Sequence, residues 1–113
     1  MSESAAPTVS DAALLVLITC PPADAEALAT ALVEARVAAC VNLLPGLRSV
    51  YRWQGAVESA GETLLIAKTT ADRYDALQAE VLARHPYELP EVLAVSVARG
   101  LPPYLRWLAD SVH

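Results

Sequence analysis

The chain has 113 residues and a formal net charge of −5, and 55% of its residues are apolar. A length in this range is typical of one domain. So apolar a composition excludes a disordered chain, and the acidic balance argues against a nucleic-acid partner, which normally meets a basic patch. The longest stretches without charge, residues 12–23 and 37–47, are much shorter than the roughly 20 residues of a spanning helix. We therefore expect no membrane span.

The apolar fraction is high for so small a chain, because a domain of this size buries only about two-thirds of its surface on folding. Part of the apolar surface is therefore expected to be buried against other subunits. The alternative is that alanine, 22 of the 113 residues, raises the fraction for reasons of genomic base composition. A single lysine among eight basic residues agrees with that alternative.

The two cysteines, Cys20 and Cys40, are too few for a disulfide framework. Residues 1–11 are rich in Ser, Ala and Pro and lack the basic and apolar regions of a signal peptide. We therefore predict a disordered tail over residues 1–11 and a single domain over residues 12–113. The expected location is the cytoplasm, where both thiols are reduced.

The first half of the domain is predicted to form a strand, a helix and a second strand. Residues 14–20 are a continuous apolar run of strand length that ends at Pro21-Pro22. Residues 24–39 contain no Gly or Pro and place apolar side chains at helical spacing. Residues 40–53 form the second strand, which a bend at Pro45-Gly46 interrupts.

The second half repeats this order. Gln54-Gly55 indicates a tight turn into a third strand over residues 56–68, which is broken near Gly61. A helix over residues 70–84 begins at Thr70 as a candidate N-cap and ends before Pro86. A fourth strand over residues 91–98 and a short helix over residues 102–112 complete the chain.

This β-α-β-β-α-β order with a C-terminal helix predicts an α+β fold, the ferredoxin-like split βαβ. A weak internal repeat agrees with it, because residues 14–16 match residues 64–66 in character. We expect the first and third strands to lie at the centre, parallel to each other, with the second and fourth antiparallel at the flanks. One edge of the sheet would then collect the following polar or ligand-type residues: Cys20, Cys40, Thr70, His85, Glu88 and Glu91.

Cys20, His85 and a carboxylate such as Glu91 form a ligand set suited to copper or zinc. Each residue also has a structural interpretation: Cys20 and Cys40 as core packing, His85 as a helix C-terminal cap and Glu91 as a surface acid. A third hypothesis makes Cys20 a nucleophile with a lowered pKa at a helix N-terminus and His85 its base. The sequence offers no oxyanion or phosphate motif beside them.

Six segments stand in the order and spacing of a known family and carry a specific resemblance over residues 14–112. They are Ile18-Thr19-Cys20-Pro21, Ala38-Ala39-Cys40-Val41-Asn42 with Pro45-Gly46, Ser49-Val50-Tyr51-Arg52-Trp53-Gln54-Gly55, Lys68-Thr69-Thr70, His85-Pro86-Tyr87-Glu88 with Pro90-Glu91, and Tyr104-Leu105-Arg106-Trp107-Leu108. In these segments the chain resembles the CutA family, the divalent-cation tolerance proteins.

The resemblance implies a ferredoxin-like subunit in a homotrimer similar to the PII signalling proteins. It also implies tolerance to copper and other divalent cations, a cytoplasmic location and no catalytic activity. Carried over by motif, the metal ligands are Cys20, His85 and Glu91; some members have two consecutive histidines where this chain has Arg84-His85. The expected function is that of a non-enzymatic, trimeric protein that binds a divalent cation such as Cu²⁺. The alternative is a PII-like sensor that binds a small molecule between subunits; no protein partner is identified.

Overall fold

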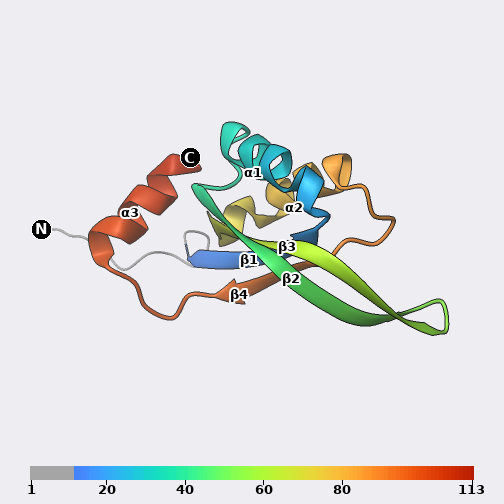
Figure 1. The fold of residues 1–113 in the computed structure, drawn as a ribbon. Helices are drawn as coiled ribbons and strands as arrows, with labels where there is room; N and C mark the ends of the chain where they lie inside the picture. Colours follow the sequence, from blue (N-terminus) through green and yellow to red (C-terminus); the bar gives the residue numbers. More distant parts are fainter. Residues whose placement is uncertain (1–11) are drawn as a thin grey trace, which may run out of the picture.

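The computed structural model describes residues 12–113, and the tail predicted over residues 1–11 lies outside them. The domain predicted over residues 12–113 contains four strands and three α-helices in the predicted order (Figure 1). The elements are β1 (Ala13–Cys20), η2 (Pro22–Asp24), α1 (Ala25–Glu34), β2 (Cys40–Trp53), β3 (Ala56–Thr70), η3 (Ala71–Arg73), α2 (Tyr74–Arg84), β4 (Val92–Ser96) and α3 (Pro102–Ser111). The α+β, split βαβ prediction is confirmed. No helix in residues 12–113 is long and apolar enough to cross a membrane.

The strands form one sheet in the order β2-β3-β1-β4, and every neighbouring pair is antiparallel. The predicted parallel arrangement of the central strands was wrong, because β1 pairs with β3 antiparallel. The reason is the chain path. Since α1 returns the chain to the end where β1 began, β2 runs in the same direction as β1, and the hairpin after β2 then reverses the direction for β3.

Opposite strand directions separate residues that were expected together. Cys20 pairs with Thr63, whereas Thr70 pairs with Ala13 and Cys40 pairs with Lys68. Thr70 and Cys40 therefore lie at the far end of the sheet from Cys20. The expected gathering of all these residues at one edge was wrong for these two.

The core lies between the sheet and the helices α1 and α2, which cover the same sheet face (Figure 1). Burial alternates along β3, where Leu65 and Ala67 are fully buried and Ile66 is only half-buried, as expected from the pleat. Apolar side chains also lie on the other face: Leu93 and Val95 of β4 are 58% and 49% exposed. The monomer therefore leaves part of an apolar sheet face open to water.

The β2–β3 hairpin projects beyond the rest of the sheet, on the opposite side from α3 (Figure 1). Gln54 and Gly55 both have positive φ, 50° and 84°, as a tight two-residue hairpin turn requires. A register shift between Leu44 and Leu47 confirms the predicted bend at Pro45-Gly46. The described chain is accordingly elongated, with principal extents of 57 × 25 × 23 Å.

The first helix ends five residues earlier than predicted. Arg36 adopts a left-handed conformation with φ 59°, and the N–H groups of Val37 and Ala38 both donate to the carbonyl of Leu32. This turn is a Schellman-like termination. It directs Val37 and Ala38 into the core, where both are buried. Their apolar character, which suggested continued helix, is explained by this packing.

Candidate metal site and family

The three predicted metal ligands approach the same end of the sheet from three elements. Cys20 is the last residue of β1, and His85 follows α2 directly. The His85 Nε2 atom lies 2.7 Å from the carbonyl oxygen of Thr19. Glu91 immediately precedes Val92, which pairs with Ile18. The topology therefore brings backbone positions 20, 85 and 91 into one region.

The side chains do not form a shared coordination sphere in this arrangement. Cys20 is fully buried in the core under the helices, whereas Glu88 and Glu91 are exposed. Over residues 12–113, no three His, Cys, Asp or Glu side chains lie close enough together to hold a metal ion. A cation bound by all three predicted ligands therefore needs a local change of conformation.

His85 has both ring nitrogens engaged. Because Nε2 faces a carbonyl oxygen, it donates a hydrogen bond to Thr19, while Nδ1 accepts one from the backbone N–H of Tyr87 at 3.1 Å. This pattern requires a neutral imidazole with its proton on Nε2. The backbone N–H of His85 also closes α2 on the carbonyl of Val81. The helix-cap interpretation thus describes His85, and a metal ligand would need one of these hydrogen bonds broken.

The environment of Cys20 favours the thiol over the thiolate. Burial raises its pKa, and the negative charges of Asp24 and Glu62 raise it further. The nucleophile hypothesis assumed a lowered pKa for Cys20 at a helix N-terminus, and the environment shifts this pKa in the opposite direction. Because the thiolate is both the nucleophile and the metal ligand, this environment disfavours a thiol enzyme at Cys20 and makes metal binding there dependent on proton release.

Sequence reasoning missed Glu62, which is only 5% exposed. Its Oε2 atom accepts a hydrogen bond from the Tyr87 hydroxyl at 2.7 Å. Burial, followed by the hydrogen bond and charge of Glu62, raises the pKa of Tyr87. The available signal was a carboxylate directly before the apolar, strand-forming residues 63–67.

Together these contacts bind the loop after α2 to the ends of β1 and β3. We call the four residues Thr19, Glu62, His85 and Tyr87 the loop clamp. The rings of His85 and Tyr87 lie 4.7 Å apart between centroids, which adds an aromatic contact to the three hydrogen bonds. The clamp holds His85 beside Cys20 and fixes its tautomer.

Cys40 has a different environment at the other end of the sheet. It is half-buried and pairs with Lys68, whose Nζ donates to the Tyr104 hydroxyl of α3 at 3.3 Å. Both cysteines are free thiols. Cys40 lies outside the core cluster that contains Cys20. Since Cys40 is half-buried, it packs only in part, and the core position predicted for it is not fully observed.

Comparison with known sequences decides the family. Residues 14–111 match the family described as CutA1 divalent ion tolerance protein. The chain belongs to the CutA family. The divalent-cation tolerance protein CutA of Thermus thermophilus is 49% identical over 98 residues, which cover 86% of this chain and 95% of that protein.

Solved CutA structures share the fold. The solved structure of the divalent cation tolerance protein from Thermus thermophilus superposes with a TM-score of 0.87 at 47% identity, covering 89% of this chain and 99% of that one. The PII-like protein CutA from Nostoc sp. PCC 7120, solved in apo form, gives a TM-score of 0.84 at 34% identity over 88% of this chain and 97% of that one. The predicted CutA membership and PII-like fold are therefore confirmed.

Proposed function

We propose that this CutA chain is a non-enzymatic protein that binds a divalent cation, with Cu²⁺ as the first candidate, through Cys20, His85 and Glu91. The observation that carries the proposal is the 2.7 Å contact of the His85 ring with the carbonyl next to Cys20. Thiolate, imidazole and carboxylate are a suitable donor set for copper or zinc. The cation is cargo in this proposal, not a resident cofactor.

Cation binding at this site requires two unfavourable changes in the described structure. His85 must give up the hydrogen bond of one ring nitrogen, which opens the loop clamp. Cys20 must lose its proton although burial raises its pKa. Both requirements couple the cation to proton release and loop movement, so the affinity should increase with pH.

A calorimetric Cu²⁺ titration tests this site. Cys20→Ser should weaken binding by at least about tenfold, because a hydroxyl is a poor soft ligand. Cys40→Ser is the matched control, since Cys40 lies at the other end of the sheet, and it should leave the affinity unchanged. Equal affinity of the wild type and Cys20→Ser contradicts the proposed site.

The proposal includes a homotrimer in the cytoplasm. Leu93 and Val95 expose an apolar sheet face, and β4 is an edge strand. Natural proteins cover such faces and edges, and further copies of the chain would do so. Light scattering after size-exclusion chromatography should give three times the 12.0 kDa of the chain. A monomeric mass contradicts the trimer.

A PII-like sensor is the second candidate, and a different observation favours it. Arg73 Nε and Thr69 Oγ1 are buried without a hydrogen-bond partner among the described residues. Buried donors without a hydrogen-bond partner are rare in proteins. A free N–H on the Arg73 guanidinium could donate a hydrogen bond to a carboxylate or phosphate of a bound small molecule. A thermal-shift screen of nucleotides, carboxylates and divalent metals distinguishes the two candidates. Shifts with metals alone contradict the sensor.

A further inference from the structure

Helix α3 is fastened at both ends to the end of the sheet that lies away from Cys20. Leu108 of α3 and Val112, which follows the helix directly, are both buried and hold its apolar face in place. Near its start, the Tyr104 hydroxyl accepts a hydrogen bond from Lys68, whose Nζ also lies 5.5 Å from the centre of the ring. Its last turn is held by His113.

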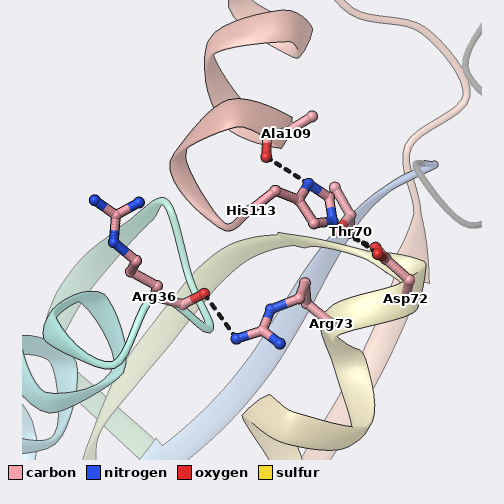
Figure 2. A network of polar contacts seen from close by, with 6 residues as sticks. All are labelled: Arg36, Thr70, Asp72, Arg73, Ala109 and His113. Carbon is pink, nitrogen blue, oxygen red and sulfur yellow. Dashed lines mark hydrogen bonds and ion pairs between the residues drawn. The ribbon is translucent and has the colours of Figure 1, made fainter.

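The His113 ring contacts two hydrogen-bond acceptors (Figure 2). Nδ1 lies 2.7 Å from the carbonyl oxygen of Ala109, and Nε2 lies 2.7 Å from Oδ2 of Asp72 in η3. The other oxygen of Asp72 accepts a hydrogen bond from the Thr70 hydroxyl at 2.6 Å. An imidazole donates from both nitrogens only when it is protonated. The geometry therefore selects the charged form of His113.

We propose that His113 is a pH-sensitive latch, which as an imidazolium ties the end of α3 to Asp72 and on deprotonation loosens that tie. The neutral ring keeps one proton, so it loses the hydrogen bond to either Ala109 or Asp72, and it also loses the charge that attracts the Asp72 carboxylate. The latch does not depend on the proposed metal site, since Asp72 follows the end of β3 that lies away from Cys20.

Several other charged side chains lie near His113. Besides Asp72, the charged side chains on α3, on η3, on the last three residues of β3 and in Figure 2 are Arg36, Lys68, Arg73, Arg106 and Asp110. Lys68 is engaged with Tyr104, Arg73 donates to the carbonyl of Arg36, and the Arg36 guanidinium points away from the network (Figure 2). Asp72 is the carboxylate whose hydrogen bond with the ring is drawn in Figure 2.

The sign of the pH dependence follows from the two partners. The Thr70 hydroxyl, followed by His113, lowers the pKa of Asp72, so its contribution is present above the ordinary value of about 3.9 and is lost as the pH falls through the lowered value. For His113 the direction follows from the geometry: only the imidazolium donates to both acceptors, so this contribution is lost as the ring deprotonates at higher pH. The latch is therefore closed at mildly acidic pH and loosens at alkaline pH.

Hydrogen exchange of the chain 1–113 tests the latch. At pH 5.5, amides of residues 108–113 should exchange about twofold more slowly in the wild type than in His113→Gln, after correction for intrinsic rates, as expected for a partly exposed ion pair. At pH 8.5 the two proteins should converge. Asp72→Asn should behave as His113→Gln does, and Arg84→Gln, which removes an exposed ion pair on α2, is the matched control. A protection ratio that is the same at both pH values overturns the latch.

A second measurement needs no variant. In an NMR titration of the wild type, the His113 ring and the protection of the Val112 amide should change with one midpoint. Midpoints that differ by more than about one pH unit, the usual spread of histidine pKa values in proteins, overturn the proposal. Metal is absent from both experiments, so their outcome is independent of the proposed copper site.

Discussion

The chain contains two histidines, one at each end of the sheet, and their ring nitrogens meet different partners. His85 contacts one acceptor and one donor, a pattern that suits a neutral ring, whereas His113 contacts two acceptors, a pattern that suits an imidazolium. His85 is buried, and His113 is exposed. The partners of the ring therefore decide what each histidine contributes to the structure. At one end the residue fixes a loop, and at the other it fastens a helix through a charge.

The largest expected effect comes from removing the buried histidine. His85→Ala leaves the Thr19 carbonyl and the Tyr87 N–H without their partners and removes a ring packed on Tyr87. We expect a loss of about 2–3 kcal/mol in the free energy of unfolding, measured in urea. His113→Ala should cost less than about 1 kcal/mol, because its ion pair is exposed. Equal losses in the free energy of unfolding for His85→Ala and His113→Ala would contradict this difference between the two histidines.

A smaller effect is expected from the other half of the loop clamp. Tyr87→Phe removes the hydrogen-bond donor that Glu62 has among the described residues and should cost about 1–2 kcal/mol. The matched control is Tyr74→Phe, which loses only an exposed hydrogen bond to Gln78 and should change stability by less than about 0.5 kcal/mol. If the two variants are equally stable, Glu62 does not depend on Tyr87.

Cys20 should react with a thiol reagent more slowly than Cys40, because Cys20 is the more deeply buried of the two. With Cys40→Ser, the remaining Cys20 thiol is fully buried and its pKa is raised. With Cys20→Ser, the remaining Cys40 thiol is half-buried. Labelling by a thiol reagent at about pH 7.5 should be at least about tenfold slower for Cys20. Faster labelling of Cys20 would restore the nucleophile hypothesis.

The smallest effect on the free energy of unfolding is expected at the end of the sheet that carries the exposed His113. Asp72→Asn should lower the free energy of unfolding by about 0.5 kcal/mol or less at pH 6. The difference from the wild type should vanish at low pH, as Asp72 is protonated, and decrease at pH 9, as His113 loses its proton. Urea unfolding at three pH values measures it. A difference that persists unchanged below pH 3 shows that the carboxylate charge is not its source.

Much of the fold could be predicted because it depends on local patterns. The apolar run of β1, the hairpin turn at Gln54-Gly55 and the element order follow from period and turn chemistry. The helix ends were less predictable, since Val37 and Ala38 are apolar whether they continue a helix or enter the core after one. Thr70 has a favourable N-cap side chain, but its hydroxyl donates to Asp72 and α2 begins after a 3-10 turn instead.

The elements, their order and the family follow from the spacing of side chains and from motifs along the chain, so the sequence is sufficient to predict them. Which residues meet depends on tertiary packing. The direction of β3 moved Thr70 and Cys40 away from Cys20, and the return of the loop after α2 placed Tyr87 on Glu62. The hydrogen-bond partners of His85 and His113 also depend on tertiary packing, because Thr19 and Asp72 come from distant parts of the chain.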